Sequence, residues 1–258
     1  MYTAAGQKAA KATRATSDLM PMRVNPFRRF LSKGLRHALR LVRVESELSW
    51  RHRRSLSRLS SVTAPKPELK LNLGCGPNVK VGWVNIDLFD SGAELQLDLR
   101  EPWPFATGSV GHAYSEHVFE HFLFPDEVTH FLAEALRVLK PGGVIDIGVP
   151  DTEWPLKAYQ VPSDEYWILA KTKWHPARCE TQLDHINYHF RQDGQHKYSW
   201  DEETLAVKLR EAGFVSVKRR GFDSYLDTES RQLGTLYMRA QKSEPTQAAP
   251  PAVQGPVK

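Results

Sequence analysis

The chain has 258 residues, of which 41% are hydrophobic, so it can bury the core of one α/β domain with appendages and is not disordered throughout. Its two cysteines, Cys75 and Cys179, exclude a disulfide framework and favour a reducing compartment. No apolar run approaches the roughly 20 residues of a membrane-spanning helix, and the N-terminus lacks the apolar segment of a secretory signal. We therefore expect a cytoplasmic protein.

Charge is divided unevenly along the chain. Residues 1–65 hold 14 lysines and arginines against three acids, a net charge of +11, whereas the remainder holds 21 against 27, a net charge of −6. An enzyme with a basic nucleic-acid groove would carry its positive charge on the body. The acidic body therefore argues against nucleic acid as a partner, and the basic arm needs an explanation of its own.

We predict a disordered basic N-terminus over residues 1–24. A basic helical arm with its linker follows over 25–68, and the amphipathic helix itself spans 25–60. Asn25 can cap the helix and Pro26 suits its first position. Apolar residues then recur at spacings of three and four: Phe27, Phe30, Leu31, Leu35, Ala38, Leu39 and Val42. This stripe either packs on the body or lies on an anionic membrane surface, and both interpretations stay open. The second would place the protein at the inner membrane face.

Residues 69–242 alternate between strand-like and helix-like segments, and 243–258, with four prolines, read as a disordered tail. Strands are predicted at 69–73, 83–88, 94–99, 111–115, 144–149, 214–217 and 236–240. A helix is predicted over 128–139, stopped by Pro141-Gly142-Gly143, and another runs to Ala212 from a capping box of Ser199 and Glu202. Alternation of this kind predicts an α/β fold whose mostly parallel, seven-stranded sheet carries helices on both faces. Its ligands would bind at the carboxyl ends of the strands, with residues 152–200 as a lid or substrate insertion.

A glycine pair closes the first strand, in the sequence Gly74-Cys75-Gly76. Glycines at this point allow a tight turn and a close approach of a ligand to the backbone, but a G-x-G alone is a weak signal. The slot of a third glycine holds Asn78 or Val79, which weakens the case for a dinucleotide pyrophosphate. Asp87 ends the second strand only eleven residues after Gly76, where an acid can hold two ribose hydroxyls.

Four blocks together resemble the class I S-adenosylmethionine-dependent methyltransferases, most closely the small bacterial type-11-like branch. They are LNLGCGPNVKVGWVNIDL, LDLREPWPF, YSEHVFEHF and RVLKPGGVIDIGVPD, in that order, and the likeness covers residues 69–242. The resemblance implies a Rossmann-like sheet and S-adenosylmethionine as cofactor. It also implies roles for single residues: Gly74, Cys75 and Gly76 along the methionine moiety, Asp87 with Leu88 at the ribose, Asp98 with Leu99 at the adenine, and Ser115, Glu116 and His117 beside the sulfonium methyl.

The third block also spells H-x-x-E-H, from His117 to His121, which is an inverted zinc-protease motif. In that interpretation both histidines bind metal from one helix face and Glu120 is the base. The motif follows a strand directly, and any helix there is barely two turns long, which argues against a metalloprotease. We expect Glu120 and His121 to be structural and His117 to face the pocket.

A second histidine cluster falls in the insertion. It comprises His175, Cys179, Asp184, His185, His189 and His196. Only one thiolate is available, whereas structural zinc sites usually have more. We therefore predict no metal here, and expect a lid packed by histidines and aromatic residues that also contacts the substrate.

The function predicted from these residues is O-methylation of a small polyhydroxylated acceptor, such as a sugar. No N-P-P-Y-type segment follows the fourth strand, and histidines can serve as bases near neutral pH. His117 is the first candidate for the base and His185 or His189 the alternates, with Asp151 orienting the imidazole or holding an acceptor hydroxyl. Two alternatives stay open: a non-catalytic S-adenosylmethionine-binding or membrane scaffold, and a nicotinamide-dependent oxidoreductase. The oligomeric state is not indicated.

Overall fold

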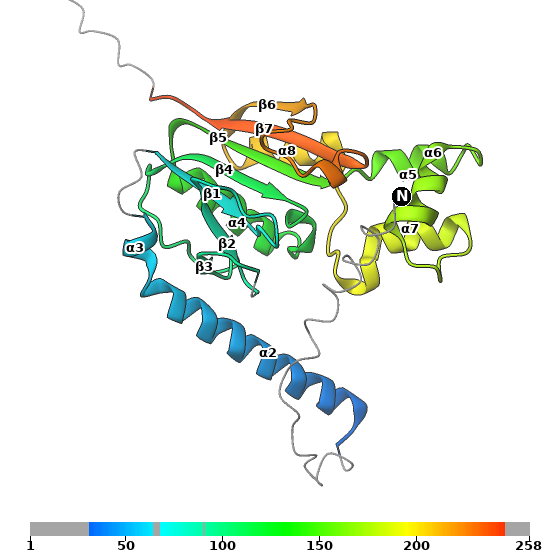
Figure 1. Cartoon of the computed structure of the whole chain (residues 1–258), viewed down its shortest axis with the longest axis horizontal. Coiled ribbons are helices and arrows are strands. Elements are labelled where there is room, and N and C mark those ends of the chain that lie inside the picture. Colours follow the sequence, from blue (N-terminus) through cyan, green and yellow to red (C-terminus); the bar gives the residue numbers. More distant parts are fainter. Residues whose placement is uncertain (1–30, 64–67, 90, 246–258) are drawn as a thin grey trace, which may run out of the picture.

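The computed structural model describes residues 31–63, 68–89 and 91–245, and Figure 1 shows their arrangement. Seven strands form one sheet in the order β3-β2-β1-β4-β5-β7-β6. Their bounds are β1 Leu69–Leu73, β2 Val84–Asp87, β3 Leu95–Gln96, β4 Val110–Glu116, β5 Leu139–Pro150, β6 Phe214–Arg220 and β7 Thr235–Lys242. Three predicted features fall outside the described part of the chain: the disordered N-terminus over 1–24, the first residues of the amphipathic helix over 25–30, and the tail over 246–258.

The sheet is parallel from β3 through β5, and β7 runs antiparallel to both of its neighbours. This confirms the predicted seven-stranded, mostly parallel sheet. The strand order reverses between β1 and β4, where Leu73 lies beside Ser115. In sheets of this kind, ligands bind outside the carboxyl ends of the strands at such a reversal.

One face of the sheet carries the apolar core. Helices α4 (Asp126–Val138) and α8 (Glu202–Glu211) pack on the inward residues of the strands, and the whole set forms one buried cluster. Helix α4 matches the predicted apolar spacing. Helix α8 does not begin as predicted: the side chain of Asp201, not Ser199, accepts the N–H of Thr204 and caps it.

The opposite face of the sheet is polar, which differs from the expected helical cover on both faces. Asn72, His112, Tyr114 and Asp146 alternate with the core residues and share this face. Within the described residues, loops cover it: Trp83 lies on His112 with ring centroids 4.8 Å apart, and the Lys80 ammonium lies over the Tyr114 ring. The connection from β1 to β2 is too short for the helix that would otherwise pack here.

A helical lobe follows β5 and faces the carboxyl ends of the strands (Figure 1). It consists of α5 (Glu153–Ala158), α6 (Glu165–Leu169), the π-helical turn η3 (Ala170–Trp174), α7 (Gln182–Arg191) and the short turn η4 (Gln192–Gly194). Its own small core contains Ala158, Tyr166, Trp167 and Ala170. The lobe is therefore packed separately from the sheet.

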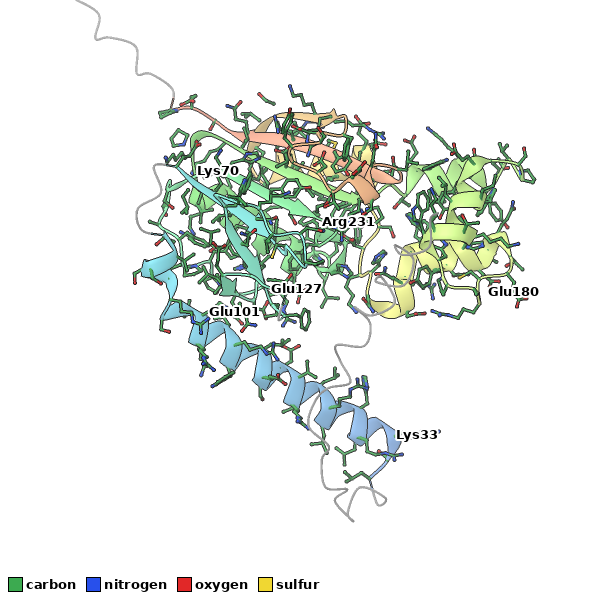
Figure 2. All side chains as sticks on the ribbon, viewed as in Figure 1. Lys33, Lys70, Glu101, Glu127, Glu180 and Arg231 are labelled. Atoms are coloured by element: carbon green, nitrogen blue, oxygen red, sulfur yellow. The ribbon has the colours of Figure 1, made fainter. Side chains whose placement is uncertain are left out.

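Helix α2 (Lys33–Leu56) projects from the β3 edge and is followed by the short helix α3 (Leu59–Thr63). Its second half is anchored, because Leu48 and Ser55 are buried and the hydroxyl of Ser55 accepts the N–H of Gln96. The first half is not: Leu39 and Val42 of the predicted stripe are 51% and 63% exposed, and Lys33 lies at the end away from the sheet (Figure 2). No helix in the described residues is long and apolar enough to cross a membrane.

Candidate functional site

The ends of β1 and β2 are joined by the carboxylate of Asp87. One carboxylate oxygen accepts the N–H of Gly76 at 2.7 Å and the other accepts the N–H of Phe89 at 2.8 Å. Each oxygen keeps a lone pair for another donor. The structure therefore brings Gly74, Gly76 and Asp87 together, as the sequence indicated.

The two glycines serve different purposes at this turn. Both have positive φ angles, +67° at Gly74 and +50° at Gly76. A Cβ on Gly74 would lie 2.3 Å from a methyl group of Val118, whereas a Cβ on Gly76 would meet nothing within 4 Å. Gly74 therefore allows β1 and the segment after β4 to approach each other, while Gly76 leaves open space next to the backbone.

Cys75 lies between them as a buried, neutral thiol. Its N–H donates to the carbonyl of Ile86, which continues the β1–β2 pairing. Burial, followed by the charge of Asp87, raises the pKa of the thiol to about 11. Cys75 is thus suited to packing against a ligand, and not to nucleophilic attack.

Ser115 contributes an unpaired polar atom at the end of β4. The side chain is fully buried and its hydroxyl has no hydrogen-bond partner among the described residues. Buried hydroxyls are normally satisfied. Together with the open space at Gly76, this hydroxyl marks the reversal point between β1 and β4 as a place for a bound group.

Other residues predicted at the cofactor already have protein partners. The carboxylate of Asp98 is bound by the guanidinium of Arg100, at 2.7 Å, and Arg100 also pairs with Glu45 of α2. Leu99 is buried in the core, and Leu88 is half-buried after β2. The arm thus reaches the side of the sheet where adenine was expected, through a contact that the sequence did not indicate.

Glu116 is turned toward the C-terminal strand. Its carboxylate accepts hydrogen bonds from the hydroxyls of Thr228 and Tyr237, and it pairs with Arg231 at 3.3 Å. Glu116 therefore fixes the segment before β7, and its place beside a transferable methyl group stays a prediction.

A cavity of about 350 Å³ lies between the carboxyl ends of β4 and β5, the lobe and the segment before β7. Figure 2 shows Arg231 at this junction. Histidines and aromatic rings dominate the lining, which includes His117, His121, His175, His189, His196, Tyr166, Trp174 and Tyr188. Such a mixture can stack on a ring and hydrogen-bond hydroxyl groups.

His117 lies in this cavity, directly after β4. Its backbone has a φ of +55°, which is uncommon for a residue with a side chain and often marks functional sites. The Nε2 atom lies 2.8 Å from the hydroxyl of Thr235. Burial, followed by the charge of Arg231, holds the pKa of His117 well below its usual range. The imidazole is therefore neutral at physiological pH.

The other catalytic candidates are separated. His189 lines the cavity, and its Nε2 is buried without a partner among the described residues, whereas His185 is buried behind His175, with their Nδ1 atoms 2.9 Å apart. Asp151 borders the cavity, but its carboxylate is paired with Arg219 at 3.0 Å. The structure thus gives His117 a different partner, Thr235, from the predicted Asp151.

The H-x-x-E-H segment does not form the metalloprotease helix, since Phe119–His121 is a single 3-10 turn, η2. Sequence reasoning missed Thr235 and Arg231, which no local spacing links to His117. It also missed a buried amide pair: Asn72 donates to Asn85 at 2.8 Å and to the carbonyl of Asn78, and thereby shapes the turn after Gly76. The sequence did carry a signal for this pair, because Asn72 and Asn85 are polar residues inside two mostly apolar strands.

Comparisons with known proteins bear on this geometry. Residues 83–147 match the family model of a methyltransferase domain. Among curated proteins, the chain is 28% identical over 117 residues to an uncharacterized 37.1 kDa protein in a transposon of Streptomyces fradiae. That match covers 36% of this chain and 33% of the relative, so the chain spans about a third of the length of the curated relative it matches.

Two of the solved structures to which the chain is similar are methyltransferases. Phosphoethanolamine N-methyltransferase 2 of Haemonchus contortus, in complex with S-adenosyl-L-methionine, is 12% identical with a TM-score of 0.44, covering 74% of this chain and 53% of that one. A 1,6-didemethyltoxoflavin-N1-methyltransferase of Burkholderia thailandensis is 18% identical with a TM-score of 0.42, covering 83% and 92%.

Proposed function

From the methyltransferase-domain match and the seven-stranded, mostly parallel sheet, we propose that the chain is a class I S-adenosylmethionine-dependent methyltransferase that methylates an oxygen atom of a small polyhydroxylated acceptor, such as a sugar. The observation that carries this proposal is the cavity of about 350 Å³, whose lining combines several histidines with aromatic rings. A cavity of this size suits a small molecule, and neutral histidines can both bind hydroxyl groups and accept their protons.

The residues at the strand ends fit S-adenosylmethionine. Gly76 leaves open space beside the backbone, Asp87 keeps free lone pairs for a diol, and the hydroxyl of Ser115 lacks a partner. We assign Gly74, Cys75 and Gly76 to the methionine moiety and Asp87 with Leu88 to the ribose. Asp98 and Leu99 border the adenine, and Ser115 and Glu116 lie nearest the methyl group. The bound cofactor supplies an electrophilic methyl carbon, and the protein aligns the acceptor with it.

His117 is the proposed general base. It follows β4 at the reversal of strand order, it borders the cavity, and Thr235 fixes its ring. In this role the imidazole takes the proton of the acceptor hydroxyl as the oxygen attacks. His189, which also borders the cavity, is the first alternate. His185 ranks lower because it lies behind His175, and Asp151 is assigned to an acceptor hydroxyl.

The test measures methyl transfer and cofactor affinity for His117→Ala, His189→Ala and His185→Ala, on acceptors found by screening polyhydroxylated compounds. Loss of a base should lower turnover roughly 10²–10⁴-fold while cofactor affinity is kept. His130→Ala is the matched control, since His130 is a half-buried histidine of α4 outside the cavity lining. Equal losses of turnover and affinity at His117 would make it structural, and transfer to amines alone would refute O-methylation. Cofactor binding without turnover on any acceptor would favour a scaffold.

We also propose that the arm, residues 25–60, binds an anionic membrane surface peripherally. In its described part, Leu35, Leu39 and Val42 are exposed and alternate with basic residues. Bases near an anionic surface contribute about 1 kcal/mol each at best, and apolar side chains can enter the headgroup boundary.

Sedimentation with phosphatidylserine vesicles tests this proposal. Full-length protein should sediment at low salt and be released by salt, whereas a chain lacking residues 1–44 should stay in solution, as should both proteins with neutral vesicles. Binding that survives both the deletion and high salt would contradict the proposal.

A further inference from the structure

Three potential ligands from distant parts of the sequence meet in the wall of the cavity. Glu120 and His121 belong to η2, whereas His196 follows the lobe, and their ligand atoms all lie within 4.8 Å of one another. The two segments are tied by the backbone, because the carbonyl of Glu120 accepts the N–H groups of Lys197 at 2.8 Å and Tyr198 at 3.3 Å. The meeting of these side chains is therefore built into the fold.

Both imidazole rings are oriented by carbonyl groups. Nδ1 of His121 lies 3.1 Å from the carbonyl of Gln195, and Nδ1 of His196 lies 2.7 Å from the carbonyl of His189. A carbonyl can only accept, so each Nδ1 carries the hydrogen and each neutral ring keeps a lone pair on Nε2. Histidines that bind metals are held in this way, with the other ring nitrogen donating to a carbonyl or carboxylate.

The carboxylate of Glu120 is only partly compensated within the protein, because a backbone N–H bonds it while one of its oxygens stays unpaired. The residue is 2% exposed, and its Oε2 atom has no hydrogen-bond partner among the described residues. The nearest imidazole nitrogens lie 3.8 Å away in His121 and 3.9 Å away in His117, too far for hydrogen bonds. Arg231 also acts on it electrostatically, but the hydrogen bonds of Arg231 go to Glu116. Burial makes ionising this carboxylate costly, and a bound cation would offset that cost.

We propose that Glu120, His121 and His196 bind one divalent transition-metal ion, for which Zn²⁺ is the best match. Two imidazoles and one carboxylate form a three-protein-ligand set that leaves coordination positions open. All three residues line the cavity, so an open position would face a bound acceptor.

The role of the ion rests on the proposed function, whereas its binding does not. An acceptor hydroxyl on the metal loses its proton more readily. The proton passes to His117, the oxygen forms a bond to the methyl carbon, and the bond from that carbon to sulfur breaks. This site differs from the metalloprotease interpretation, because His117 is bonded to Thr235 and the third ligand comes from His196.

The experiment strips the full-length protein of metal with a chelator and titrates it with Zn²⁺ alone, by calorimetry and elemental analysis. One ion should bind per chain, and Co²⁺ in its place should give visible absorption bands. Glu120→Gln and His196→Ala should each weaken binding roughly 100-fold or more. His130→Ala, which removes a half-buried histidine of α4 outside the cluster, should leave binding unchanged.

Cofactor affinity and near-ultraviolet circular dichroism verify that the variants fold. His121→Gln is the second variant if either of the others fails, since the His121 side chain is 37% exposed. The proposal is overturned if the wild-type chain binds no stoichiometric metal, or if the folded variants bind it as tightly as the wild type does. The titration contains no acceptor, so it tests metal binding independently of methyl transfer. If one Zn²⁺ binds per chain but the separate assay detects no O-methylation, only the proposed function is refuted.

Discussion

At the scale of single residues, Asp87 connects the turn after β1 to the end of β2. Its carboxylate accepts the N–H groups of Gly76 and Phe89, and each oxygen keeps a lone pair for a further donor. Charge-assisted hydrogen bonds to a diol are among the stronger contacts of a cofactor. Replacing Asp87 by alanine should therefore weaken S-adenosylmethionine binding by roughly 2–3 kcal/mol.

Calorimetric titration of the two proteins measures this difference. Asp126→Ala, at an exposed position in the first turn of α4, is the matched control and should bind as the wild type does. Asp87→Asn separates the two roles of the side chain, because an amide oxygen can still accept a backbone N–H but carries no charge. An unchanged affinity in Asp87→Ala would remove Asp87 from the cofactor site.

At the scale of elements, helix α2 is divided between an anchored half and an exposed half. Leu48 is 7% exposed and Leu41 is 50% exposed, although both are leucines of the same helix. Leu48→Ala should lower the free energy of unfolding by about 2–3 kcal/mol, since it leaves a cavity at the β3 edge. Leu41→Ala should change it by less than about 0.5 kcal/mol.

Urea unfolding of both variants measures these values. Equal and small effects would mean that α2 does not pack on the body, whereas equal and large effects would mean that its first half is also covered. The second result would favour the packing interpretation of the stripe over membrane contact.

The elements themselves were largely predictable because their signals are local. The apolar period of α4 and the apolar runs of the central strands identify these elements, which differ from the predicted ones mainly at their ends. The helices of the lobe, in contrast, were not predicted. Predictions were wrong where a contact with a nearby residue determines the outcome. Asp201 caps α8 in place of Ser199, because its side chain accepts the N–H of Thr204. Likewise, the length of β3, Leu95–Gln96, depends on pairing with β2 and not on its own residues.

At the scale of the whole molecule, the candidate site is a product of contacts between distant segments. Gly76 and Asp87 could be paired in advance because both end neighbouring strands. The partners of His117 and Glu116, which are Thr235 and Thr228, lie more than a hundred residues away. His196 and Glu120 also come from separate parts of the sequence, so a metal set spread over η2 and the segment after the lobe has no spacing that a sequence motif could reveal.

The polar face of the sheet also joins distant strands, through Asp146. This carboxylate is fully buried in β5 and bonds to His112 of β4 at 2.7 Å, to Arg220 of β6 at 2.6 Å and to Arg239 of β7 at 2.8 Å. Burial alone would raise its pKa, but these partners outweigh burial and lower the pKa from 3.8 to about 2. The parallel half of the sheet and its antiparallel edge are thus connected by one ionised group.

A depressed pKa in the folded state stabilises the protein above the pKa of the unfolded chain, and that contribution is lost as the pH falls through the folded value. For Asp146 the window runs from about pH 4 down to about pH 2, and the contribution is about 2 kcal/mol. Asp146→Asn cannot lose a charge in this window. The difference in unfolding free energy between wild type and Asp146→Asn should therefore shrink by about 2 kcal/mol between pH 5 and pH 2, measured by urea unfolding at a series of pH values. Comparing the two proteins cancels the other carboxylates, which titrate in both. A difference that stays constant over this range would show that the partners do not lower the pKa of Asp146, which leaves the backbone pairing of β5 with β7 and apolar packing to hold the two halves of the sheet together.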